Sequence, residues 1–310
     1  MNKFSATISL FKSFDGCSIT IYHWKVEQPK FCLHIIHGMS EHAGRYDDFA
    51  KWLNSKEISV FSSDLRGHGL TAGDIKNVGF FDEEDGWNKV VKDLSLIHKK
   101  FSSEISSVPN IILGHSLGSL LARSLSIDYE ELTNALIFSA TSDHPGIKGR
   151  IGKPIAKMNS LLFGKRKQSK FLDFLTYIDF NKKIKSVKTK KDWLTRDELV
   201  VNRYINDPYC MQIFSNQFFC DLAYGILKVN EPLKIALMNP NTPILLLSGK
   251  MDPVGNFGKG ILRIAKKFKT KKINKVTVKL FEDGRHEMLN ELNKDEVYNY
   301  IYSWIKNTFK

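Results

Sequence analysis

The chain has 310 residues, 42% of them hydrophobic, which predicts one large globular domain or one domain carrying an insertion. No window approaches the ~20 uninterrupted apolar residues of a membrane span, and the first residues lack the apolar stretch and cleavage site of a signal peptide, so we expect a cytoplasmic protein. The four cysteines show no CxxC spacing, and we expect reduced, structural thiols.

The formal net charge of +13 is unevenly distributed. Residues 148–191 hold 14 lysines and arginines against two acidic residues, and residues 259–279 hold nine basic residues and no acidic one. Blocks this dense attract anionic lipid or nucleic acid, although a solvated lysine-rich surface explains them equally well. Because no nucleic-acid motif or interleaved aromatic pattern accompanies them, we expect no nucleic-acid partner.

The predicted elements begin with two alternating segments, 4–11 and 18–26, on either side of Asp15-Gly16, a pattern typical of a hairpin with a two-residue turn. Short apolar runs that predict strands buried on both faces follow at 31–36, 58–65, 110–116, 134–140, 243–249 and 275–281. Helical patterns lie at 45–56, 85–101, 118–129, 257–269 and 294–308. This alternation predicts an α/β fold with a mostly parallel sheet and helices on both faces.

One connection is far longer than a crossover requires, because about a hundred residues separate the run ending at Ala140 from the run beginning at Pro243. We therefore predict a helical insertion over 141–242 that divides the core into 1–140 and 243–310. A helical stripe of apolar residues and a second apolar helical stretch at 210–229 support it; the stripe consists of Ile151, Ile155, Met158 and Leu162. An insertion leaving the carboxyl end of a strand would cover an active site as a cap.

Ser116 stands between two glycines directly after a predicted strand, in the sequence GHSLG (114–118). The pattern G-x-S-x-G is typical of a sharp strand-to-helix turn that exposes a nucleophilic hydroxyl. A five-residue match to this pattern also occurs by chance in ordinary turns. A catalytic serine needs a histidine to take its proton and a carboxylate to orient that histidine, so the remaining sequence must supply both.

Two histidines follow Ser116 in the chain, and His286 is the better base because it lies just past the last predicted strand, whereas His144 begins the insertion. Asp252 follows a buried strand and is the preferred carboxylate. Asp283 is the alternative, although local hydrogen bonding or solvation explains it more simply. Ser116, Asp252 and His286 appear in the chain order of an α/β-hydrolase triad.

Acyl transfer also requires hydrogen-bond donors for the negative oxygen of the tetrahedral intermediate. The backbone amide of Leu117, directly after the nucleophile, is one candidate. The second is the amide of Met39, in the glycine-containing loop after the strand at 31–36.

Five segments carry a resemblance to a known family: HGMSEHAGRY (37–46), DLRGHG (64–69), GHSLGS (114–119), SGKMDPVG (248–255) and RHEMLNE (285–291). Together they resemble the monoacylglycerol lipase and lysophospholipase branch of the α/β-hydrolase superfamily over about 30–305. The resemblance implies eight strands, a helical cap and a triad at Ser116, Asp252 and His286. Within the insertion, RYINDPYC is similar to a family stretch whose tyrosine reaches a glycerol head group, which implies that Tyr204 contacts substrate.

The sequence thus predicts a serine hydrolase that cleaves carboxylic esters of lipid-like substrates, monoacylglycerol or lysophospholipid, through an acyl-enzyme and without a cofactor. The motif HEMLNE lacks the second histidine of a zinc hydrolase, so we expect no metal. A peptidase or thioesterase of the same fold, or a non-catalytic ligand receptor, remains an alternative. The lysines beside the apolar stripe favour peripheral contact with anionic membrane, whereas an ordinary cap helix lining an acyl pocket is the alternative.

Overall fold

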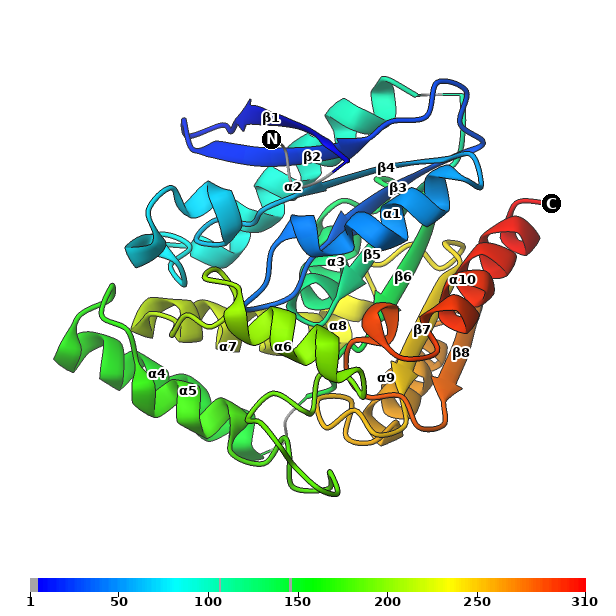
Figure 1. Cartoon of the computed structure of the whole chain (residues 1–310). Helices are drawn as coiled ribbons and strands as arrows, with labels where there is room; N and C mark the ends of the chain where they lie inside the picture. Colours follow the sequence, from blue (N-terminus) through cyan, green and yellow to red (C-terminus); the bar gives the residue numbers. More distant parts are fainter. Residues whose placement is uncertain (1–4, 106, 145–146) are drawn as a thin grey trace.

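The computed structural model describes residues 5–105, 107–144 and 147–310, in which eight strands form one sheet in the order β1-β2-β4-β3-β5-β6-β7-β8 (Figure 1). The strands are β1 (Thr7–Lys12), β2 (Ser18–Trp24), β3 (Phe31–Ile36), β4 (Ile58–Ser63), β5 (Asn110–His115), β6 (Ala135–Ser139), β7 (Ile244–Gly249) and β8 (Val276–Phe281). Strand β2 pairs antiparallel with β1 and β4, and every later pair is parallel. The predicted fold class, a mostly parallel eight-stranded α/β-hydrolase sheet, is confirmed.

Helices cover both faces of the sheet because the strand side chains alternate between two cores. Ile111 and Leu113 of β5 pack with α1 and α10, whereas Ile112 packs with α2, α3 and α9. These core helices are α1 (Asp47–Asn54), α2 (Gly86–Ser103), α3 (Leu117–Asp128), α9 (Lys259–Thr270) and α10 (Lys294–Thr308). Parallel strands that are covered on both faces read as continuous apolar runs, which is why the sequence predicted them closely.

The amino-terminal hairpin is present, but its turn is longer than the two residues predicted. The Ser13 amide donates to the Cys17 carbonyl at 2.8 Å, which leaves Phe14, Asp15 and Gly16 in the loop. Gly16 has φ +86°, so it takes the left-handed conformation of a three-residue loop. The edge strand β8 also differs from the prediction, because Val276–Leu280 are only partly buried.

Residues 140–243, between β6 and β7, contain α4 (Ile147–Phe163), α5 (Lys170–Tyr177), α6 (Glu198–Asn206), α7 (Asn216–Asn230) and α8 (Pro232–Ile235). Helix α4 packs against α7 and buries Ala156 and Ser160, which lie outside the apolar stripe noted in the sequence. Met158 and Leu162 of that stripe are 56% and 68% exposed, Ile155 is partly buried, and the side chain of Ile151 lies outside the described residues.

Large apolar side chains on α4, on α5 and at the residue after α5 are exposed, and α4 and α5 lie together at the lower edge of the molecule in Figure 1. They are Met158, Leu161, Leu162, Phe163, Phe171, Phe174, Leu175 and Ile178. We call them the exposed apolar residues of α4 and α5. In the described part of the chain, no helix combines the length and apolar character that a membrane crossing requires. The four cysteines are free thiols, as predicted.

Candidate active site

Ser116 occupies a strained turn between β5 and α3. Its φ of +51° and ψ of −117° lie outside the regions that residues with a side chain ordinarily adopt. The turn is also tightly packed, since a Cβ added to Gly118 would lie 2.0 Å from the Ile36 carbonyl oxygen, and one added to Gly114 would lie 2.3 Å from the Gly118 carbonyl oxygen. Both flanking glycines are therefore required, and the turn leaves Ser116 partly exposed among buried neighbours.

The structure brings His286 and Asp252 together. Their side chains are 3% and 0% exposed, and His286 Nδ1 lies 2.9 Å from Asp252 Oδ1. Asp252 is itself held in place, because Oδ2 accepts a hydrogen bond from Ser248 Oγ at 3.0 Å and Oδ1 accepts one from the Val254 amide at 2.9 Å. Asp283, the alternative carboxylate, points to solvent with 82% of its side chain exposed.

Charges around His286 favour its protonated form. Burial alone would lower the pKa of His286, but the charge and the hydrogen bond of Asp252 outweigh burial and raise it. His115 packs against it with the ring centroids 4.8 Å apart, and burial lowers the pKa of His115 to about 4, so that neighbour is neutral.

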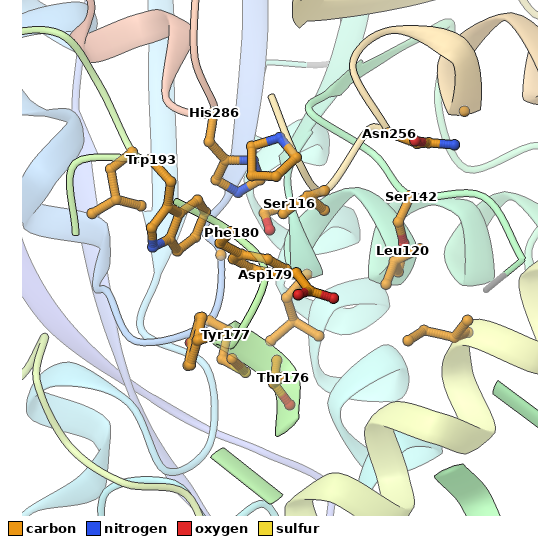
Figure 2. Close-up of a pocket in the computed structure, with 18 of the residues that line it drawn as sticks. Ser116, Leu120, Ser142, Thr176, Tyr177, Asp179, Phe180, Trp193, Asn256 and His286 are labelled. Atoms are coloured by element: carbon orange, nitrogen blue, oxygen red, sulfur yellow. The ribbon is translucent and has the colours of Figure 1, made fainter. Parts of the chain in front are cut away.

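Ser116 and His286 line one cavity of about 820 Å³, and Figure 2 shows both side chains at its wall. A volume of this size suits a small lipid or drug-sized ligand. Five stretches of chain form the walls: the loops after β3, β5, β7 and β8, and the segment between β6 and β7. All of these loops lie at the carboxyl edge of the sheet, where sites of open α/β folds occur.

The loop after β3 carries the predicted donor Met39, and a buried histidine fixes its course. His37 Nδ1 lies 2.8 Å from the Gly38 carbonyl oxygen, and His37 Nε2 accepts from the Leu65 amide at 3.0 Å. Burial lowers the pKa of His37 to about 3, so the ring stays neutral and can make both contacts. Met39 and Leu117 both line the cavity, and the role of their amides as oxyanion donors stays a prediction.

A segment between α5 and α6 packs directly on the histidine loop. The Trp193 ring lies 4.9 Å from the His286 ring, centroid to centroid, and the Glu287 amide donates to the Leu194 carbonyl at 2.7 Å. Figure 2 shows Trp193 beside His286, with Phe180 and Tyr177 on the same side of the cavity. Trp193 was not predicted, because a single tryptophan in a lysine-rich segment belongs to no periodic apolar pattern.

Tyr204 of α6 also lines the cavity and is 4% exposed. The Arg45 guanidinium lies 4.9 Å from the centroid of its ring, and the Lys191 ammonium lies 5.5 Å from it. Tyr204 therefore borders the cavity, with two cationic side chains near its ring. Its contact with substrate stays a prediction.

Glu41, Arg45 and Glu287 form a buried ion network at the histidine loop that was not predicted from the sequence. Glu41 and Arg45 belong to the segment HGMSEHAGRY, and Glu287 follows His286 directly. These charged residues at helix-like spacing resemble a solvated turn, and nothing local indicates that Arg45 pairs with a residue 242 positions away.

One group in the described part of the chain could hold a metal ion, because the ligand atoms of His42, Asp207 and Cys210 all lie within 4.8 Å of one another. His42 Nε2 lies 3.1 Å from Asp207 Oδ2. Burial raises the pKa of the Cys210 thiol, which keeps it protonated and a poor metal ligand. These residues do not line the cavity that contains Ser116.

Comparison with known proteins gives consistent results. The family model described as "Serine aminopeptidase, S33" matches residues 27–293. The monoglyceride lipase homolog of monkeypox virus is 25% identical over 301 residues, covering 96% of this chain and 98% of that protein. Human monoglyceride lipase is 25% identical over 301 residues, covering 94% of this chain and 88% of that protein.

Among solved structures, a thermostable carboxyl esterase from Bacillus coagulans in complex with glycerol has a TM-score of 0.89 at 24% identity, covering 99% of this chain and 100% of that one. A soluble variant of the Saccharomyces cerevisiae monoglyceride lipase, bound to a substrate analog, has a TM-score of 0.76 at 19% identity, covering 99% of this chain and 97% of that one. These likenesses establish the fold, and the family model covers most of the sequence. The chain therefore belongs to the serine aminopeptidase S33 family of α/β-hydrolases.

Proposed function

We propose that this protein is a serine hydrolase that cleaves carboxylic esters of lipid-like substrates. The observation that carries the proposal is the buried His286–Asp252 pair, at 2.9 Å, on the wall of the cavity that also contains the strained Ser116. A binding protein has no need of a nucleophile turn, a buried imidazole and an aligned carboxylate in one cavity.

In the proposed reaction, Ser116 Oγ attacks the ester carbonyl while His286 takes its proton. Asp252 holds the ring through Nδ1, which leaves Nε2 for the nucleophile. The amides of Met39 and Leu117 stabilise the tetrahedral oxyanion by roughly 3 to 4 kcal/mol each. His286 then protonates the leaving alcohol, and a water molecule that it activates hydrolyses the acyl-enzyme.

The proposed substrate is a monoacylglycerol or a lysophospholipid. The support is the size of the cavity, its largely apolar inserted wall, and relatives that are named monoglyceride lipases. Leu175, Phe180 and Leu222 supply apolar surface for an acyl chain, and Tyr204 offers a hydroxyl toward the alcohol. No cofactor enters this chemistry.

The test is hydrolysis of monoacylglycerols, lysophospholipids and p-nitrophenyl esters by the wild type and by Ser116→Ala. We expect acyl release by the wild type only, and covalent labelling of Ser116 by a fluorophosphonate. Peptide and thioester substrates belong in the same panel, since the family model carries a peptidase description. Preference for a peptide or thioester would replace the ester proposal, and equal rates from both proteins would refute it.

We also propose that residues 141–242 act as a cap over a core made of 1–140 and 243–310. Trp193, Leu194 and Tyr204 close one side of the cavity, which supports this division. The cytoplasmic location expected from the sequence stays a prediction.

The exposed apolar residues of α4 and α5 support peripheral contact of this cap with anionic membrane. They lie within the segment that carries 14 basic and two acidic residues. Insertion of apolar side chains and attraction of lysines to anionic lipid reinforce each other, with roughly 1 kcal/mol from each basic residue near the surface. Leu175 and Ile178 also line the cavity, so docking there would bring lipid to its wall.

Vesicle sedimentation tests this contact with anionic and neutral vesicles at low and high salt. We expect stronger binding to anionic vesicles, weakened by salt, and a loss of binding in Leu161→Ser/Leu162→Ser. Leu233→Ser is the control, because Leu233 is 73% exposed on α8, which lies within 141–242 but outside the basic segment. Equal binding to both kinds of vesicle, or equal loss in the control, would contradict the proposal.

A further inference from the structure

Arg45 is enclosed by two carboxylates from distant parts of the chain. Arg45 Nη1 donates to Glu41 Oε2 at 2.8 Å and to Glu287 Oε1 at 2.8 Å, and Nη2 donates to Glu287 Oε2 at 2.7 Å. The three side chains are at most 11% exposed. Charged groups with this burial are retained only where the hydrogen bonds satisfy them, and here both terminal nitrogens of Arg45 are engaged.

Each carboxylate of this ion triad also fixes a loop of the site. Glu41 Oε1 accepts from the Gly38 amide at 2.5 Å and from the Tyr46 hydroxyl at 2.9 Å. Gly38 directly precedes Met39, and a Cβ added to Gly38 would lie 3.2 Å from Ser116 Cβ, so this loop passes over the nucleophile. The Gly38 amide is thereby occupied, which leaves the next amide, that of Met39, for the oxyanion.

At the other end, Glu287 is the residue after the proposed base. Its Oε2 also accepts from Asn290 Nδ2 at 3.0 Å. The ion triad of Glu41, Arg45 and Glu287 therefore links the loop that carries Met39 to the loop that carries His286 by a continuous chain of hydrogen bonds. A shift of one loop would break charge-assisted bonds in a buried environment, where such bonds are strong.

The triad also has an unbalanced charge, because two carboxylates face one guanidinium. The charged and titratable groups that act on His286 are Asp252 in direct contact, His115 through its neutral ring, and Glu41 and Glu287 at longer range. The negative charges of Glu287 and Glu41 both act to raise the pKa of His286, in addition to Asp252.

We propose that Arg45 and Glu287 are positioning residues, which lock the loop carrying the Met39 amide to the loop carrying His286, and that the Glu287 charge stabilises the imidazolium formed during acyl transfer. This inference rests on the proposed function. It assigns to Glu287 a task that is separate from those of the proposed catalytic residues Ser116, Asp252 and His286.

The test compares the wild type with Glu287→Gln, which keeps the shape and the hydrogen-bonding capacity but removes the charge. Arg45 remains paired with Glu41 in this variant, so no buried charge loses its only partner. Glu291→Gln is the matched control: Glu291 lies on the same loop, its side chain is 0% exposed, and it pairs with Arg196 instead.

For Glu287→Gln, we expect the His286 pKa, measured by NMR titration of the free protein, to fall by about one unit. The acid limb of the kcat/KM profile should move equally, and kcat should fall about tenfold with KM changed less than twofold, since the oxyanion contact forms in the transition state. Glu287→Asp, which restores the charge, should recover the wild-type pKa.

A merely structural role for Glu287 would lower the melting temperature and leave the titration and the pH profile unchanged, and that result would overturn the inference. Equal shifts in Glu291→Gln would overturn it as well. The NMR titration requires no turnover, so it remains informative if Ser116→Ala shows that the proposed function is wrong.

Discussion

The bond between His286 and Asp252 depends on which carboxylate the fold brings to the ring. Asp283 is nearer in sequence, yet it is 82% exposed and lies 3.9 Å from Arg196. Asp252 is completely buried and held by Ser248 and Val254, so its acceptor oxygen has a fixed direction. A fixed acceptor selects one tautomer of the imidazole, which a mobile surface carboxylate cannot do.

We predict that Asp252→Asn lowers kcat/KM for ester hydrolysis about 10⁴-fold, because an amide at this position favours the wrong tautomer of His286. Asp283→Asn should stay within twofold of the wild type. Steady-state kinetics on a p-nitrophenyl ester measure both. A large loss in the Asp283 variant, with little loss in the Asp252 variant, would reverse the assignment.

The sequence pointed to Ser116, Asp252 and His286 as candidates because each follows a recognisable strand. It did not predict Glu287 or Trp193, since the contacts of these residues come from segments far away in the chain. Arg45 reaches Glu287 across 242 positions, and no local pattern reports such a pairing.

The turn from β5 to α3 shows how an element can depend on the absence of a side chain. Gly118 lies on the first turn of α3 and passes so close to the end of β3 that the carbonyl oxygens of Ile36 and His37 would both collide with an added Cβ. The positive φ of Ser116 is the consequence of a helix that begins this close to the sheet.

Gly118→Ala should therefore lower the melting temperature strongly and abolish turnover, because backbone atoms must move to relieve the overlap. Gly152→Ala is the matched control. Gly152 lies within α4 with nothing within 4 Å of an added Cβ, and alanine there should stabilise by about 1 kcal/mol. Thermal unfolding of both variants is the measurement, and a stable, active Gly118→Ala protein would contradict the reading of this turn.

Helices α4 and α7 were predicted because they combine length with clear apolar spacing. Helices α5 and α6 were not, since they span only 8 and 9 residues and lie in charged sequence. The face of α4 that packs on α7 is not the apolar stripe noted in the sequence. Ala156 and Ser160 permit close packing on α7, so small residues mark the interface and the larger ones stay exposed.

For the whole molecule, the order of strands and helices along the chain followed from the sequence because β1 and β2 alternate in polarity and the six later strands are short apolar runs. The arrangement of 140–243 over the sheet did not, as it depends on contacts such as those of Arg285. Its Nη1 donates to the carbonyls of Asp192 at 2.6 Å and Thr195 at 3.0 Å. Contacts of this type between distant segments leave no periodic pattern in the sequence from which they could be predicted.

The stability of the molecule should depend steeply on acid, because burial strongly lowers the pKa of five histidines in the described part of the chain and also lowers that of His23. The five are His34, His37, His68, His98 and His115. Below pH 6.5 the unfolded chain binds protons that the folded chain does not, so each histidine costs about 1.4 kcal/mol per pH unit until its folded pKa is reached. Asp221, whose pKa burial raises to about 7, acts in the opposite direction, and so does His286, whose pKa Asp252 raises.

The five histidines outnumber these opposing groups, and we expect the free energy of unfolding to fall by roughly 6 kcal/mol between pH 6.5 and 5.0, because an unfolded histidine is only half protonated at pH 6.5. Urea unfolding at several pH values measures it. His98→Gln should reduce the slope by about one fifth. A free energy of unfolding that is constant over this interval would show that these rings are not neutral in the folded protein.

The exposed apolar residues of α4 and α5 have a practical consequence for handling the protein. In buffer without lipid, two copies of the protein can bury these exposed apolar residues against each other, as a bilayer would bury them. The lysines around them repel one another and oppose this association. Added salt weakens only the repulsion. Concentrated samples at high salt should therefore become turbid first, and a mild detergent should dissolve the aggregates.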